Sequence, residues 1–128
     1  MNRIDYLQIL RQAVVLAKDG DGRSALALLD EALNHPRDES NLRGLRQLCL
    51  SGAVIAGNSG DPETAVRFYE HVLEFAPSDP RALYGLIGVY RRIGETKKVN
   101  EFVAKCRQAC LDSGDKEILA LLEQRESS

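Results

Sequence analysis

The sequence predicts an all-α fold made of short helices that follow one another directly. Two helix starts and one helix stop fall within residues 60–80. Asp61-Pro62 and Asp79-Pro80 each join a capping carboxylate to a proline suited to the first helical turn, and Pro77 ends the helix between them. Between these signals, apolar residues recur every three or four positions and so share one helical face: Ala65, Phe68, Tyr69, Val72 and Phe75. No stretch of the chain is a candidate strand.

The same start, stop and spacing signals predict seven helices. The first begins at a capping box formed by Asn2 and Asp5, and the last begins near Asp115 after Gly114. Gly52 weakens the third helix unless a partner helix packs closely against it. Gly94 is a natural residue to end the fifth helix. The predicted helices span about 2–18, 22–34, 38–58, 62–75, 80–93 and 95–112, with the seventh starting near 115.

A repeat of 34 residues runs through the second half of the chain. Gly94 follows Gly60 by this interval, and Val99 follows Ala65 by the same interval. Gly20-Asp21 and Ala25 repeat the pattern earlier, at an offset of 40. We interpret the extra residues of the first interval as an N-terminal extension of the third helix. A period of 34 residues is typical of a helix-pair repeat.

The segment from Gly60 to Pro77 closely resembles the second helix of a tetratricopeptide repeat (TPR). It has a Gly-Asp turn, a small residue at Ala65, an aromatic pair at Phe68 and Tyr69, and a closing proline. The resemblance implies a right-handed α-solenoid of about three TPR-like helix pairs plus a C-terminal capping helix. It makes the chain one TPR-like domain over residues 1–128, with repeats at about 3–36, 38–77 and 79–112 and the capping helix at about 115–126.

Composition narrows the functional classes. A hydrophobic content of 44% with 28% charged residues is ordinary for a globular chain and argues against disorder. The net charge of −2 gives no indication of nucleic-acid binding. Three cysteines without a Cys-x-x-Cys motif, and no apolar leader or membrane-spanning stretch, indicate a reduced, cytoplasmic chain without membrane association.

Three groups of residues are candidates for metal or catalytic sites. Cys106 and Cys110 share a helical face but have no further ligands at suitable spacing, so we expect buried thiols. Asp19, Asp21 and Asp30 have the spacing of a calcium loop, but Arg23 occupies a ligand position, and a helix-linking turn is the better interpretation. His71 lies near Glu70 and Glu74 without a nucleophile to complete a catalytic set. The sequence therefore predicts no catalytic residue, metal, cofactor or enzymatic activity.

Charge is distributed unevenly along the chain. Residues 81–110 carry seven basic residues against two acidic ones, whereas residues 19–41 carry six acidic residues against two basic ones. Such a pattern is typical of solvated helix faces. It is also compatible with a basic docking surface for an acidic peptide, or with head-to-tail association of two copies through opposite ends.

The TPR resemblance implies a concave inner wall formed by the first helix of each pair. Leu10, Val14 and Ala17 then supply the wall of the first pair, and the peptide-binding groove of the other two comprises Leu50, Val54, Asn58, Arg81, Tyr84, Arg91 and Arg92. The implied function is a non-catalytic protein–protein interaction adaptor or scaffold that binds a peptide or helix with acidic and apolar residues. The alternative is a secretion-chaperone-like or self-associating assembly protein whose groove is covered in a homo-oligomer.

Overall fold

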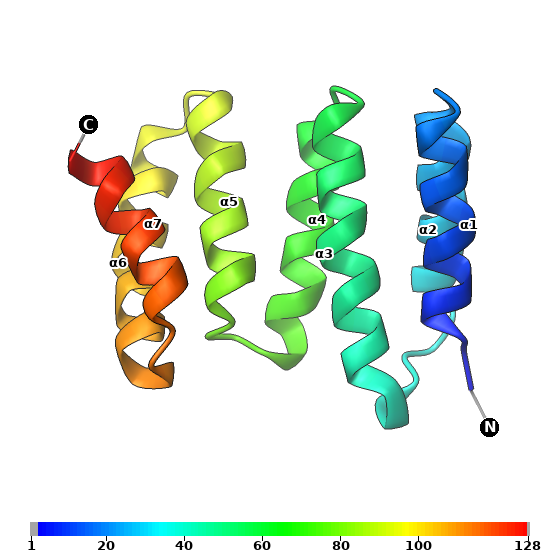
Figure 1. Cartoon of the computed structure of the whole chain (residues 1–128), viewed down its shortest axis with the longest axis horizontal. Coiled ribbons are helices and arrows are strands. Elements are labelled where there is room, and N and C mark those ends of the chain that lie inside the picture. The colour runs from blue at the N-terminus through cyan, green and yellow to red at the C-terminus, as the bar shows by residue number, and fades with distance from the viewer. Residues whose placement is uncertain (1–2, 128) are drawn as a thin grey trace. The chain divides into compact units, whose positions relative to one another are not determined.

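The structure, a computed structural model, describes residues 3–127, with side chains through residue 125. This part of the chain is helical throughout, which confirms the predicted all-α class (Figure 1). Its elements are α1 (Tyr6–Lys18), α2 (Gly22–Asn34), the 3-10 helix η1 (Glu39–Asn41), α3 (Leu42–Asn58), α4 (Pro62–Phe75), α5 (Pro80–Arg92), α6 (Thr96–Ser113) and α7 (Lys116–Ser127). They form two compact units, Met1–Val72 and Leu73–Ser128, which are described separately below.

Unit 1 is built around the mutual packing of α1, α2 and α3, with α4 against α3. Its largest fully buried side chains are Tyr6, Leu29, Leu48 and Phe68. A Cβ atom at Gly52 would lie 3.2 Å from Leu29 Cδ1 and 3.3 Å from Phe68 Cε2, which confirms that a partner helix packs closely there. Ala65, where the repeat requires a small residue, is completely buried.

The turn that joins the two helices of each pair has the same construction three times. Its glycine adopts a positive φ, which an L side chain would disfavour, and the amide of the next residue donates to the carbonyl five positions earlier. The glycines are Gly20, Gly60 and Gly94, and the donating amides are those of Asp21, Asp61 and Glu95, each 2.9 Å from its acceptor. The 34-residue interval from Gly60 to Gly94 is therefore a repeat of structure as well as of sequence.

The first helix begins later than predicted. It starts at Tyr6, and the Asp5 side chain accepts a hydrogen bond from the Gln8 amide at 3.0 Å. Asp5 is thus the capping residue itself, instead of the third residue after a cap at Asn2. Asn2 lies outside the described residues.

The connection from α2 to α3 also differs from the prediction of one helix from residue 38. Asp38 instead caps the short 3-10 helix η1, and α3 starts anew at Leu42 behind a second cap, Asn41. The cause is a pair of tertiary contacts. Asp38 accepts a hydrogen bond from the Ile4 amide at 3.1 Å, and its own amide donates to the Tyr6 hydroxyl at 3.0 Å. These bonds hold Asp38 against the N-terminal segment and prevent it from entering the helix.

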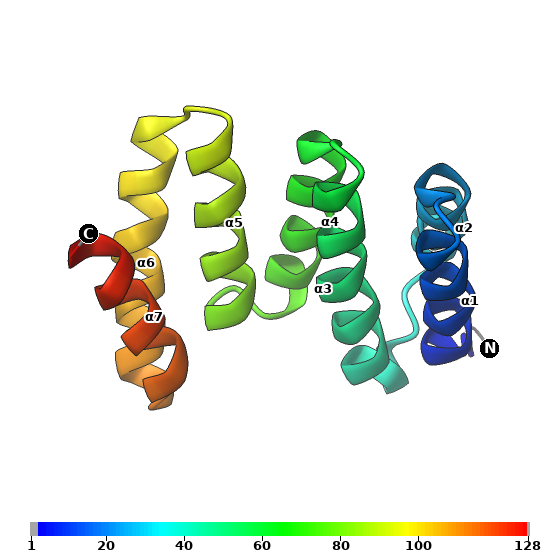
Figure 2. The ribbon, with the colours of Figure 1, turned by 45° about the horizontal axis from the view of Figure 1, so that its top comes forward.

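Unit 2 contains α5, α6 and α7, which pack on one another (Figure 2). Their common core includes Leu83, Ile87, Cys106, Ile118 and Leu122, and Val99 packs against its edge. The helix boundaries agree with the predicted ones to within about a residue. Cys106 and Cys110 are buried here, which confirms the expectation of buried thiols, and Cys49 is buried in unit 1.

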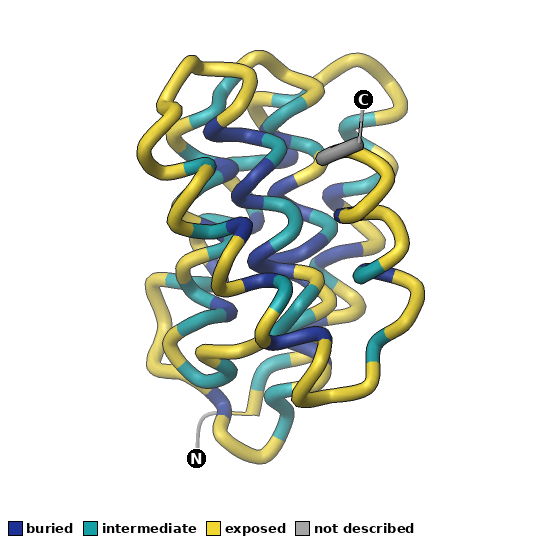
Figure 3. Tube along the Cα trace, turned by 90° about the vertical axis from the view of Figure 1, so that its left-hand side faces the viewer, coloured by how far each residue is buried: buried dark blue, intermediate teal, exposed yellow. Residues whose placement is uncertain are grey.

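Most buried residues belong to the helices, while most turns are exposed (Figure 3). None of the helices in the described part of the chain is long and apolar enough to cross a membrane.

Candidate functional site

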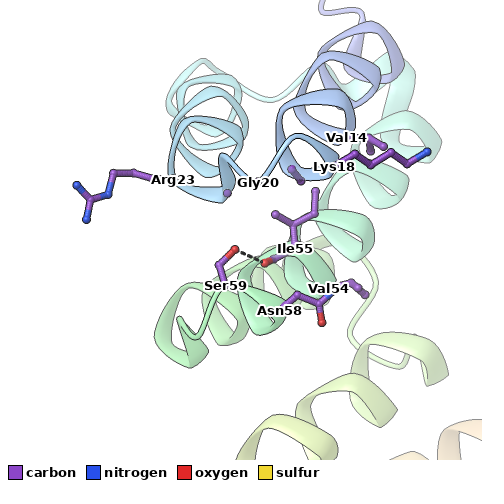
Figure 4. Close-up of a pocket in the computed structure, with 10 residues that line it drawn as sticks. Val14, Lys18, Gly20, Arg23, Val54, Ile55, Asn58 and Ser59 are labelled. Atoms are coloured by element: carbon purple, nitrogen blue, oxygen red, sulfur yellow. Dashed lines mark hydrogen bonds between the residues drawn. The ribbon is translucent and has the colours of Figure 1, made fainter.

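A hollow of about 730 Å³ opens in unit 1 between the α1–α2 hairpin and the C-terminal half of α3 (Figure 4). We call it the unit 1 hollow. Both apolar and polar side chains line it: apolar Val14, Val54 and Ile55, polar Asn58, and basic Lys18 and Arg23. Its size falls in the range of ordinary ligand sites.

The α1–α2 turn positions one side of this hollow. Gly20 ends α1, and Asp21 then caps α2 by accepting a hydrogen bond from the Ser24 amide at 3.1 Å. Hydrogen bonds from the side chain and amide of Ser24 lower the pKa of Asp21, so the cap is charged at neutral pH. The cap stabilises the start of α2 beside the hollow.

The end of α3 forms the opposite side. A Cβ atom at Gly22 would overlap the Ser59 hydroxyl, so the turn approaches α3 as closely as the backbone allows. The Ser59 hydroxyl donates to the Ile55 carbonyl at 2.8 Å, which holds it along its own helix (Figure 4). These contacts bring Gly22 and Ser59 close together within the lining of the hollow.

The exposed part of the hollow is apolar with a cation beside it. Val54 is 56% exposed, and Val14 is half-buried. In Figure 4, Lys18 extends on the side where Val14 and Val54 lie, whereas Arg23 extends away on the other side. A ligand that covers the two valines would therefore meet an ammonium group at its edge. The lining thus offers apolar contact with a cation beside it, an arrangement suited to binding.

The structure brings some of the predicted groove residues together. Val54 and Asn58 line the unit 1 hollow beside Val14 and Ala17, while Leu50 is only 9% exposed and contributes mainly to the core. Sequence reasoning missed Lys18, Arg23, Ile55 and Ser59. Lys18 could have been found, because it follows Val14 by four positions and so lies on the same helical side.

The remaining predicted groove residues belong to α5 in unit 2. Arg81 is exposed in the first turn of this helix, and Arg91 and Arg92 are exposed in its last turn. Tyr84 is half-buried, and its ring faces the Arg125 guanidinium of α7, whose carbon lies 5.5 Å from the ring centroid. Arg125 was not anticipated as a neighbour of Tyr84. Its position three residues after Leu122, a core residue of α7, was the available signal.

No protein-family model matches this sequence, and no curated protein matches it either. Solved structures do resemble the fold. One is PcrH, crystallised in complex with the chaperone-binding region of PopB, with a TM-score of 0.74 and 10% identity over 97% of this chain and 96% of that one. Another is the C-terminal TPR-containing domain of a Plasmodium falciparum FK506-binding protein, with a TM-score of 0.60 and 17% identity over 96% and 89%. The chain therefore has the all-α fold of TPR-containing proteins.

Proposed function

We propose that this chain is a non-catalytic protein-binding adaptor that holds a segment of another polypeptide in the unit 1 hollow. The observation that carries the proposal is Val54, an apolar side chain that is 56% exposed at the mouth of a preformed hollow. Exposed apolar side chains that line a concavity mark binding sites more reliably than scattered ones do. The cytoplasmic location expected from the sequence suits such a role.

The lining defines the chemistry of the bound segment. Val14, Val54 and Ile55 offer an apolar surface that a leucine-sized side chain of the partner would cover, and Asn58 offers an amide to its backbone. Lys18 would attract a carboxylate placed next to that apolar residue. We therefore expect the partner to present an apolar residue beside an acidic one.

A chaperone-like form of this function is the second candidate. It is supported by the resemblance to PcrH, whose solved structure holds the chaperone-binding region of PopB. In this form the bound segment belongs to a client protein, or the hollow is covered by self-association until a client arrives. Light scattering over a concentration series distinguishes an adaptor from a self-covered protein. The molar mass of an adaptor stays constant, whereas that of a self-covered protein changes with concentration.

The test of the proposed function is a selection from a random peptide display library on the immobilised chain. We expect enrichment of sequences that place an apolar residue beside an acidic one. Amide chemical shifts of the labelled chain, recorded with a selected peptide, should change around Val14, Val54 and Asn58. The proposal is contradicted if no sequence is enriched, or if the shifts change elsewhere and leave these residues unaffected.

A further inference from the structure

The turn between α5 and α6 concentrates positive charge. Every residue from 91 to 98 is exposed, and the segment carries four cations against a single acid. Ile93 stands among them with 46% of its surface exposed. We call this segment the basic turn, and its charged and apolar members are Arg91, Arg92, Ile93, Lys97 and Lys98.

The basic turn shares the backbone construction of the two equivalent turns but differs from them in its side-chain cap. Asp21 and Asp61 cap α2 and α4 with their side chains, and Asp61 bonds both the amide and the hydroxyl of Thr64. Glu95 occupies the same place before α6 and makes no capping hydrogen bond with its side chain. The free amides at the start of α6 therefore receive no hydrogen bond from the Glu95 carboxylate.

Two lysines add to this unbalanced charge. Lys97 and Lys98 lie in the first turn of α6, which contains no acidic residue. Cations are unfavourable at a helix N-terminus, because they meet the positive end of the helix dipole. Local rules of helix stability are broken most often where a protein uses the residues for binding.

Two further basic residues of unit 2, Lys105 and Arg107, are engaged within the chain. Lys105 pairs with Glu101 at 3.2 Å and lies 4.9 Å from the centre of the Phe102 ring. Arg107 pairs with Glu123 at 3.2 Å. Among the side chains that the structure describes, Arg92, Lys97 and Lys98 take part in no ion pair. Four of the seven basic residues within 81–110 therefore lie in the basic turn.

We propose that the basic turn is a second interaction surface, which binds an acidic segment of a partner polypeptide. Carboxylates of that segment complete the charge balance of α6 by pairing with Lys97, Lys98 and Arg92, and Ile93 contacts an apolar side chain between them. The surface lies in unit 2, so this proposal stands independently of the unit 1 hollow.

The features of the turn favour a polypeptide over the other polyanions. Residues 91–98 include no aromatic side chain on which a nucleic-acid base could stack, and the whole chain has a net charge of −2. A single exposed isoleucine provides little apolar area for insertion into a membrane. A short acidic segment needs only the few cations that the turn supplies.

The experiment measures the fluorescence anisotropy of a labelled peptide of aspartate and glutamate with one central leucine, titrated with the full chain. The variant is the double reversal Lys97→Glu, Lys98→Glu. It should weaken binding at least about tenfold, because it replaces attraction by repulsion at the contact. The same variant should raise the melting temperature, because it places acids at the start of α6, so lost binding cannot be attributed to unfolding.

The matched control is Arg43→Glu, Lys116→Glu, which changes the net charge equally at two exposed positions outside residues 91–98. It should retain binding within about twofold of the unaltered chain, because distant surface charges are screened by salt. The proposal is overturned if the reversal at the turn and the control weaken binding equally, or if neither affects it. It is also overturned if single-stranded DNA or phosphatidylserine vesicles bind the chain more tightly than the peptide and lose that binding in the turn variant.

Discussion

Gly52 of α3 faces the ring of Phe68 of α4 so closely that a Cβ atom at position 52 would lie 3.3 Å from Phe68 Cε2. Phe68 and Leu29, the other neighbour of that position, are completely buried and cannot easily move aside. We expect Gly52→Ala to lower the free energy of unfolding by about 1 kcal/mol, because crowding outweighs the gain in helix propensity. Chemical denaturation measures this change.

Gly88 of α5 provides the matched control. A Cβ atom there would lie 3.7 Å from the nearest atom, an Arg125 guanidinium nitrogen, which is an ordinary contact. Gly88→Ala should therefore raise the free energy of unfolding by up to about 1 kcal/mol. Equal stabilisation by the two alanines would show that α3 and α4 do not pack as described.

Asp38 should make unit 1 sensitive to acid. Hydrogen bonds from the Ser40 side chain and the Ile4 amide lower its pKa from the usual 3.8. A carboxyl with a lowered pKa in the folded state contributes stability above its unfolded pKa, and this contribution is lost as the pH falls through the folded value. We expect the free energy of unfolding to decrease as the pH falls below about 4.

The variant Asp38→Asn tests this assignment. It should be less stable than the unaltered chain at neutral pH, because the amide replaces a charged acceptor by a neutral one. Its stability should also vary less with pH below about 4, because one of the titrating groups is gone. Denaturation curves at several pH values give the free energy of unfolding of both proteins. If this free energy changes equally with pH in the two proteins, the role of Asp38 is contradicted.

Glu95 begins α6 without a capping hydrogen bond from its side chain. Asp21 and Asp61, at the equivalent positions, make such bonds. Because the shorter aspartate side chain reaches the free amides of a first turn, Glu95→Asp should raise the free energy of unfolding by about 0.5–1 kcal/mol. A decrease in stability would indicate that Glu95 has a contact that the capping argument omits.

The three cysteines should react slowly in the folded protein. Burial raises the pKa of the Cys106 thiol to about 12, and it raises that of Cys110 as well. Since the thiolate is the reactive form, labelling by iodoacetamide at pH 8 should be slow in buffer and fast in denaturant. Mass spectrometry after timed quenching gives the rate at each position, including buried Cys49. Rapid labelling of any of the three in buffer would exclude it from the core.

Sequence patterns predicted the helices where the stop and start signals are local. Asp61-Pro62, Pro77 and Gly94 act on their immediate neighbours, so their helix ends agree with the structure. The start of α3 could not be predicted in this way. It depends on two hydrogen bonds, in which Asp38 accepts from the Ile4 amide and donates to the Tyr6 hydroxyl, with partners more than thirty residues earlier in the chain.

The candidate site likewise combines features that local sequence patterns predict with features that depend on contacts between distant residues. Helical spacing alone places Val54 and Asn58 on one side of α3. The hollow that they line also requires the α1–α2 turn, which approaches because Gly22 leaves room for Ser59. The stacking of Arg125 on Tyr84 likewise requires the path of α7, which no local signal in α5 contains.

The most direct test of the binding account compares two valines with a peptide obtained from the display selection. Val54 and Val15 are similarly exposed, at 56% and 58%, but only Val54 lines the unit 1 hollow. In calorimetric titrations, Val54→Glu should lower the affinity for the peptide at least about tenfold, because it places a carboxylate in the apolar contact. Val15→Glu should leave the affinity within about twofold of the unaltered chain. Equal affinities of the two variants for the peptide would contradict the unit 1 hollow as the binding site.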